Sequence, residues 1–115
     1  MTTNLDKWQE QIRKIKQELL GLGEMRPGAL SRQFNVCGKP GCRCKDRENP
    51  KKHGPYYQIS YTHQGKSTSE FVKREMVADA RTQLANYARF KKLTQAWVQL
   101  SLRIAAGRRK NRRSS

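Results

Sequence analysis

A cluster of three cysteines constrains this chain more than any other feature of its sequence. The three lie within eight residues, in the segment Cys37-Gly38-Lys39-Pro40-Gly41-Cys42-Arg43-Cys44. The glycines and the proline between them allow the sharp turns that bring thiols together. In a reducing compartment, cysteines this close together indicate a metal ion rather than a disulfide.

The residues after the cluster supply a fourth ligand. His53 follows Cys44 by nine residues, and three cysteines with one histidine are a common tetrahedral set for structural zinc. We therefore predict a zinc loop over residues 37–55, with the ligands Cys37, Cys42, Cys44 and His53. The alternatives for the fourth position are His63, Asp46, Glu48 and a site shared between two chains. The opposing interpretation is three unliganded thiols in a mobile loop.

A structural metal would compensate for a thin hydrophobic core. Apolar residues make up 35% of the 115 residues, below the roughly 45–50% of an average globular chain. A chain with so few apolar side chains gains stability from a metal, a ligand or a partner chain. Four protein ligands leave no open position on the ion, so the predicted zinc is structural and not catalytic.

The first segment predicts an amphipathic helix over residues 4–21. Its apolar residues follow a spacing of three and four: Leu5, Trp8, Ile12, Ile15, Leu19 and Leu22. This spacing forms one stripe on a helix, with Asn4 as the expected N-cap. The stripe fits a core-facing helix and a coiled-coil dimer equally well.

A β-hairpin is predicted over residues 56–72. Tyr57, Ile59 and Tyr61 alternate with polar residues, and Gly65 supplies the positive φ of a turn before the returning strand. The segment from Ala29 to Val36 is ambiguous, and a short helix over 30–34 is one interpretation.

The last element is a long helix over residues 74–106. Its apolar residues form two stripes, and a helix with two apolar stripes usually has partners on two sides. The first stripe contains Ala80, Leu84, Tyr87, Val98, Leu102 and Ala105, and the second contains Phe90, Leu93, Trp97, Leu100 and Ile104. We expect the first helix as one partner and a second copy of the protein, giving a homodimer, as the other. Gly107 is predicted to end the helix, and residues 107–115 to form a disordered basic tail. The expected fold is therefore α+β, with a single domain over residues 1–106.

The charge of the chain predicts a polyanionic partner. There are 25 Lys and Arg residues against 9 Asp and Glu, a formal charge of +16, and no acidic residue follows Asp79. Self-repulsion of this size costs stability unless an anion neutralises it. Nucleic acid is favoured, DNA over RNA, and an anionic membrane is the rival. No apolar run approaches a membrane span and the N-terminus lacks a signal-peptide core, so a cytoplasmic, nucleoid-associated protein is expected.

The expected phosphate contacts fall in three groups. Around the cysteines lie Lys39, Arg43, Lys45, Arg47, Lys51 and Lys52. A row on the last helix contains Arg81, Lys92 and Arg103, spaced by eleven residues, with Arg89 close by, and it is expected on a face away from both apolar stripes. The tail contains Arg108, Arg109, Lys110, Arg112 and Arg113. Tyr56 is the aromatic residue expected to be available for stacking on bases.

An enzymatic function is not expected. The acidic residues are scattered, and neither histidine has an evident nucleophile to activate. The glycine-rich segments Gly21-Leu22-Gly23 and Gly38-Lys39-Pro40-Gly41 both lack the spacing of a phosphate-binding loop. The hypothesis is a non-enzymatic nucleic-acid-binding protein. The alternative is a protein-interaction adapter whose helices dock on a larger partner.

The motifs resemble those of a family of small bacterial proteins. They are Met25-Arg26-Pro27-Gly28-x-Leu30-Ser31, then Cys37-Gly38-Lys39-Pro40-Gly41-Cys42-x-Cys44, then His53-Gly54-Pro55-Tyr56-Tyr57. Members of that family occur beside insertion-sequence transposases and in other mobile elements. The resemblance implies a mobile-element setting, with a transposase as a further partner. By pattern alone, Tyr56 to Phe90 also resembles the arm-binding module of tyrosine recombinases, in which a small sheet enters a DNA groove.

Overall fold

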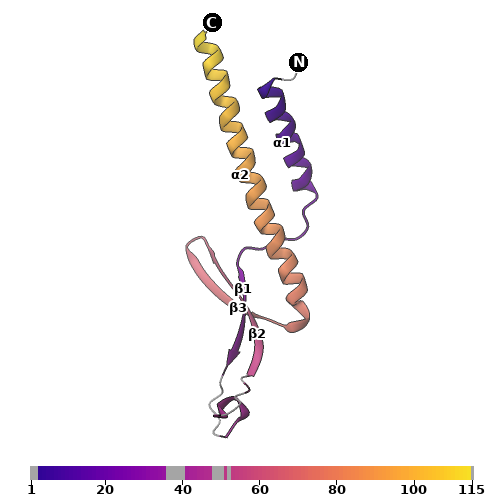
Figure 1. Cartoon of the computed structure of the whole chain (residues 1–115), viewed down its shortest axis with the longest axis vertical. Coiled ribbons are helices and arrows are strands. Elements are labelled where there is room, and N and C mark those ends of the chain that lie inside the picture. Colours follow the sequence, from indigo (N-terminus) through magenta and orange to yellow (C-terminus); the bar gives the residue numbers. More distant parts are fainter. Residues whose placement is uncertain (1–2, 36–40, 48–50, 52, 115) are drawn as a thin grey trace. The chain divides into compact units, whose positions relative to one another are not determined.

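The protein has the α+β architecture that the sequence predicts. The computed structural model describes residues 3–35, 41–47, 51 and 53–114. Along the chain it has helix α1 (Asn4–Leu20), strand β1 (Ala29–Asn35), the 3-10 turn η1 (Arg43–Lys45), strands β2 (His53–His63) and β3 (Lys66–Val72), the 3-10 turn η2 (Arg74–Met76) and helix α2 (Val77–Ser114) (Figure 1).

The chain divides into two compact units. The first, called the helical unit, contains Met1–Met25 and Ala85–Ser115; the second, called the sheet unit, contains Arg26–Leu84. No helix in the described part of the chain is both long enough and apolar enough to cross a membrane.

The N-cap of helix α1 lies one residue earlier in the chain than predicted. The N-cap is Thr3, not Asn4 as expected, because Thr3 and Asp6 form a capping box. The Asp6 amide donates to Thr3 Oγ1 at 3.1 Å, and the Thr3 amide donates to Asp6 Oδ2 at 3.3 Å. Two amide groups that the helix leaves without partners are satisfied in this way.

In the helical unit, α1 runs antiparallel beside α2 (Figure 1). All six stripe residues from Leu5 to Leu22 are half-buried, whereas Leu20 outside the stripe is 88% exposed. The α2 side of the pair is the second predicted stripe, in which Leu100 is 6% and Ile104 is 8% exposed. Lys16 lies over the ring of Trp97, with 5.2 Å from Nζ to the ring centroid. The predicted pairing of first and last helices is therefore confirmed.

Helix α2 does not end where the sequence predicts. It passes through Gly107 and continues to Ser114, so the expected helix of residues 74–106 with a tail over 107–115 was wrong in its boundary. A glycine inside a helix costs only about 1 kcal/mol relative to alanine. A Cβ at Gly107 would lie 3.9 Å from the Trp8 ring, so this turn of α2 passes close to α1.

The sheet unit has a three-stranded antiparallel sheet in the order β1-β2-β3. The predicted hairpin is present, but β2 begins at His53, three residues before the predicted start. Gln64 (φ 52°) and Gly65 (φ 77°) form its two-residue turn, with both φ angles positive. The suggested short helix over 30–34 was wrong, because this segment is β1, with Leu30 opposite Ile59. A two-stranded hairpin is marginally stable in water, and pairing with a third strand outweighs weak local preference.

The two faces of the sheet differ in burial. One face carries Tyr57, Ile59 and Tyr61; Ile59 is fully buried and both tyrosines are half-buried. In the same unit, Ala80 on the first turns of α2 is 5% exposed, and these side chains form a small core. The opposite face, called the open face, carries mainly small polar residues and is exposed at most positions.

Candidate metal centre and its basic surroundings

Two cysteines and a histidine converge at one end of the sheet. The ligand atoms of Cys42, Cys44 and His53 all lie within 4.8 Å of one another. Cys42 Sγ and His53 Nε2 are 3.1 Å apart. Cys44 is 2% exposed, while the other two residues are half-buried. Among the described residues, this is the group with the composition and spacing to hold a metal ion.

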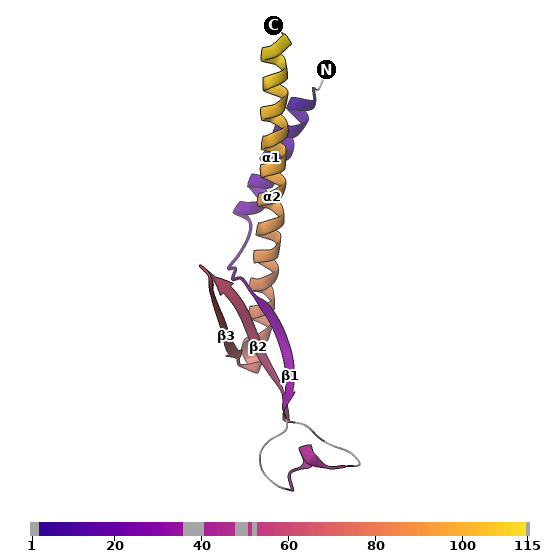
Figure 2. The ribbon, with the colours of Figure 1, turned by 90° about the vertical axis from the view of Figure 1, so that its left-hand side faces the viewer.

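Backbone hydrogen bonds of a compact loop bring the two cysteines together. The Lys45 amide donates to the Cys42 carbonyl at 3.0 Å and closes η1 around Cys44. The Asp46 and Lys51 amides both donate to the Arg43 carbonyl, at 3.2 and 2.9 Å. The loop therefore folds back on itself and reaches β2, whose first residue is His53. Figure 2 shows η1 beyond the edge where β1 ends and β2 begins.

The donor set fits a tetrahedral soft metal. Zinc–sulfur bonds of about 2.3 Å and zinc–nitrogen bonds of about 2.0 Å place neighbouring tetrahedral ligand atoms roughly 3.4–3.8 Å apart. The three ligand atoms here need small shifts to meet that spacing. Cys37, predicted as a fourth ligand, and Glu48, an alternative to His53, lie outside the described residues. The cluster includes neither Asp46 nor His63, and His63 is at the other end of an 11-residue strand, about 30 Å away.

Gly54 allows β1 to approach the strand that carries His53. Its φ is +137°, and a Cβ there would lie 2.8 Å from the Gln33 carbonyl oxygen and 3.1 Å from the Phe34 ring. A side chain at this position would meet both a backbone penalty and a clash with β1. His53 is the preceding residue, so its position depends on this close contact.

The Gly54→Ala substitution is therefore expected to weaken metal binding. The strained φ alone costs about 1–3 kcal/mol, and the clash displaces the strand next to His53. Gly65→Ala is the matched control, because Gly65 also has a positive φ but has no atom within 4 Å of the added Cβ. Both variants should melt at a lower temperature. A zinc competition titration should show weaker binding for Gly54→Ala alone; equal affinities would contradict this role.

The loop that carries the metal cluster also carries exposed cations. The described basic residues of the loop, all exposed, are Arg43, Lys45, Arg47 and Lys51. We call these four residues the basic loop. Positive charges stabilise thiolates and thereby favour metal binding. The same exposed cations face solvent, where they can meet phosphate groups. Lys39 and Lys52, also predicted for this surface, lie outside the described residues.

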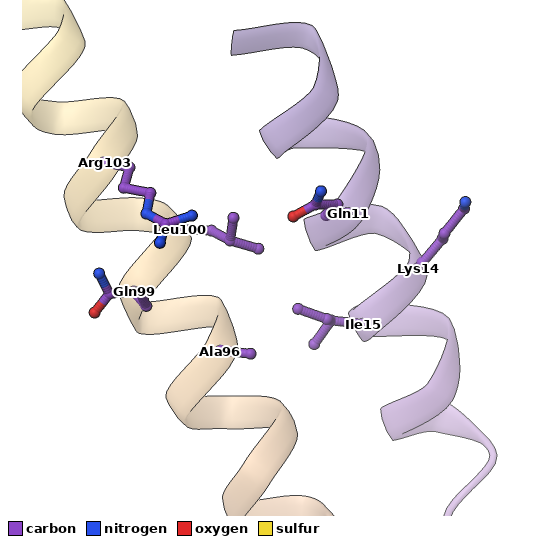
Figure 3. Close-up of a pocket in the computed structure, with 7 residues that line it drawn as sticks. All are labelled: Gln11, Lys14, Ile15, Ala96, Gln99, Leu100 and Arg103. Carbon is purple, nitrogen blue, oxygen red and sulfur yellow. The ribbon is translucent and has the colours of Figure 1, made fainter. Parts of the chain in front are cut away.

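The predicted row of cations on α2 is not a separate face. Arg89 forms an ion pair with Glu18 of α1, at 3.1 Å. Arg103 borders a groove of about 390 Å³ between the two helices, whose floor includes Ile15 and Leu100 (Figure 3). The prediction that this row lies away from the apolar stripes was wrong, because α1 packs against the side of α2 that carries Arg89 and Arg103. Lys92 is exposed on α2, and Arg81 is exposed in the sheet unit.

The remaining predicted residues lie at the end of α2 and on the open face. Arg108, Arg109 and Lys110 are exposed on α2; Arg112 and Arg113 belong to the helix, but their side chains are outside the description. Tyr56 is 42% exposed on the open face, as expected. Phe71, which the sequence analysis did not single out, is 74% exposed on the same face. Its partner across the sheet is Gln58, two residues from Tyr56. The register of the predicted hairpin could have indicated that Phe71 and Tyr56 share a face.

Comparison with known protein families places the sheet and the metal cluster in a shared domain. The model of a domain of unknown function, DUF6788, matches residues 5–82. The chain belongs to this family. The DUF6788 match begins in α1, includes the cluster and all three strands, and ends in the early turns of α2. No curated protein and no solved structure matches the chain significantly.

Proposed function

We propose that this protein binds nucleic acid, and that zinc folds the basic loop into the surface that contacts phosphates. The observation that carries the proposal is the convergence of Cys42, Cys44 and His53 inside a loop with four exposed cations. A loop without a hydrophobic core needs a metal to hold its cations in fixed positions. Fixed cations bind phosphates with less loss of conformational entropy than mobile ones.

Zinc is the proposed metal because the ligands are thiols and an imidazole. Such ligands suit zinc, whereas magnesium and calcium prefer oxygen. Cys37 is the proposed fourth ligand, since it belongs to the same short cysteine segment. The closed ligand set gives the metal a structural role, and we propose no reaction.

DNA is the favoured ligand and RNA the alternative. The favoured setting is a mobile element, in which the protein assists a transposase as an accessory. This setting rests on the resemblance of the cysteine and His-Gly-Pro-Tyr motifs described above. The excess of 25 basic over 9 acidic residues supports a polyanionic partner of either kind.

The proposal is tested by fluorescence anisotropy with labelled duplex DNA, single-stranded DNA and structured RNA over a salt series. We expect binding with a steep dependence on salt, because each phosphate contact releases counterions. The preferred ligand of the three identifies the class of nucleic acid. Absence of binding to all three at about 50 mM salt would refute the function.

Removing the basic end of α2 distinguishes a nucleic-acid-binding protein from an adapter. A chain that ends after Gly107 loses five arginine and lysine residues but retains the buried Leu100 and Ile104. Its affinity for nucleic acid is expected to fall by about tenfold or more at moderate salt, with a shallower salt dependence. Unchanged affinity and slope in the truncated chain would favour the adapter.

The exposed apolar side of α2 supports self-association. Val98 is 58% and Leu102 is 61% exposed, and Arg103 is the single charged residue between Lys92 and Arg108. Thr94, Gln95, Val98 and Gln99 surround a hollow on this helix. A hollow of this kind on an exposed helix can accept one apolar side chain of a facing helix. We propose that Leu102 of a second, antiparallel copy enters it, since two such basic chains can approach most readily at an uncharged face.

Self-association is expected to be abolished by Leu102→Glu. Light scattering coupled to size-exclusion chromatography should give a dimer mass for the wild type and a monomer mass for the variant. Arg13→Glu, on the exposed surface of α1, changes the charge more but should leave the dimer intact. A monomeric wild type at about 100 μM would contradict self-association and leave the face available to a different protein.

A further inference from the structure

The open face of the sheet is uncharged, so binding of phosphates does not explain its composition. By strand register it carries Ala29, Ser31 and Gln33 of β1, four residues of β2, and three of β3. The β2 and β3 residues are Tyr56, Gln58, Ser60, Thr62, Ser67, Ser69 and Phe71. No residue of this described face is charged, although 30% of the chain is. A solvent-exposed face without charges is unusual in a chain of this composition.

Two aromatic side chains project from one end of this face. Phe71 is 74% and Tyr56 is 42% exposed. Phe71 is directly opposite Gln58, and Tyr56 precedes Gln58 by two residues on the same side of β2. The two aromatics are therefore diagonal neighbours, which lie about 7–8 Å apart in an antiparallel sheet. Tyr56 and Phe71 are called the aromatic pair.

Hydroxyl groups on the open face form hydrogen bonds between β2 and β3. Ser60 Oγ and Ser69 Oγ are hydrogen-bonded at 3.1 Å, and Thr62 Oγ1 and Ser67 Oγ at 2.9 Å. Cross-strand pairs of this kind stabilise a sheet that has few apolar residues. Beside the aromatic pair, Gln33 lies opposite Tyr56, and Gln58 lies opposite Phe71. Amide side chains both donate and accept hydrogen bonds, as the edges of bases require.

The aromatic pair lies at the end of the sheet nearest the basic loop. Tyr56 follows the metal ligand His53 by three residues, and both belong to β2. Lys73 and Arg74 follow β3 directly after Phe71 and Val72, and both are exposed. Cations thus flank an uncharged aromatic surface within one compact unit. This arrangement matches a single strand, whose phosphates are charged and whose bases are uncharged rings.

We propose that the open face binds unpaired bases, with Tyr56 and Phe71 stacking on them while the basic loop holds the adjoining phosphates. This inference rests on the proposed nucleic-acid function and adds the class of ligand: single-stranded nucleic acid. Bases in a duplex are stacked on each other and leave no ring face for the aromatic pair. The protein should therefore prefer a single strand to a duplex of the same length when salt weakens the phosphate contacts.

An abasic oligonucleotide tests the inference, because it keeps every phosphate and lacks the bases. Wild-type protein should bind the normal strand about 5- to 150-fold more tightly than a strand with abasic positions at its centre. Tyr56→Ala and Phe71→Ala should each lose most of this difference while binding the abasic strand as the wild type does. Phe90→Ala is the control, since Phe90 is an exposed aromatic residue of the helical unit. Circular dichroism confirms that each variant is folded.

The outcomes separate this inference from the proposed function. Equal affinity for normal and abasic strands, unaffected by either substitution, would overturn the open-face proposal and leave phosphate binding intact. Failure of the wild type to bind any strand would overturn both. Loss of base-dependent binding in Tyr56→Ala and Phe71→Ala, but not in Phe90→Ala, is the result that we expect.

Discussion

Replacing Cys44 with serine is expected to reduce the bound zinc from about one equivalent per chain to well below half an equivalent. Cys44 is 2% exposed and its Sγ belongs to the ligand cluster, so no surface residue can easily replace it. A serine hydroxyl is a poor zinc ligand at neutral pH because it stays protonated. Since structural zinc supplies folding free energy directly, the sheet unit should also lose several kcal/mol of stability.

Two histidines on one strand provide the control for the zinc prediction. His53 and His63 are the first and last residues of β2, and the cluster includes only His53. His53→Ala should lose metal as Cys44→Ser does, whereas His63→Ala should retain it. The measurement is elemental analysis of protein purified under reducing conditions without chelators, with thermal melts alongside. Less than about half an equivalent of zinc in the wild type would refute the zinc site itself.

Neutralising the basic loop is expected to produce the second large effect. Substituting Lys45, Arg47 and Lys51 with glutamine removes three exposed charges next to the metal cluster. Each lost phosphate contact reduces the magnitude of the negative slope of log affinity against log salt by about 0.7 to 0.9. The magnitude of the slope should therefore fall by about 2 to 3, and affinity at low salt should fall by one to two orders of magnitude.

A matched variant separates a specific surface from net charge. Lys7, Lys14 and Lys91 are also exposed, and all three belong to the helical unit. Substituting them with glutamine removes the same charge from the protein but leaves the basic loop intact. Anisotropy titrations at several salt concentrations should show a much smaller change in slope for this control. Equal slopes for the two variants would mean that charge alone, without the loop, determines binding.

Local sequence patterns predicted the features that are determined by residues close together in the sequence. Gly65 follows Gln64 between two alternating strands, and a two-residue turn is the expected result. The three-four spacing from Leu5 to Leu22 correctly gave the face of α1 that packs on α2. The convergence of Cys42, Cys44 and His53 also followed from a short segment. In each case the determining residues are neighbours in sequence.

The errors concern interactions between distant segments. Residues 30–34 become a strand because β2 pairs with them, and their own sequence does not specify this. Arg89 and Arg103 were expected on a free face, but α1 packs beside them. Gly107 was expected to end α2, and it does not because a helix tolerates a glycine near a packed Trp8. Phe71 was not singled out, although the register of the predicted hairpin places it on the same face as Tyr56.

The most direct test of the central claim is the binding of one single-stranded oligonucleotide by zinc-loaded and by metal-stripped protein over a salt series. We expect the zinc-loaded protein to bind with a steep salt dependence. Stripping the metal should weaken binding and flatten the slope, and adding zinc back should restore both. Identical titration curves with and without zinc would contradict a zinc-folded phosphate-binding loop, and absence of binding by the loaded protein would contradict nucleic-acid binding as a whole.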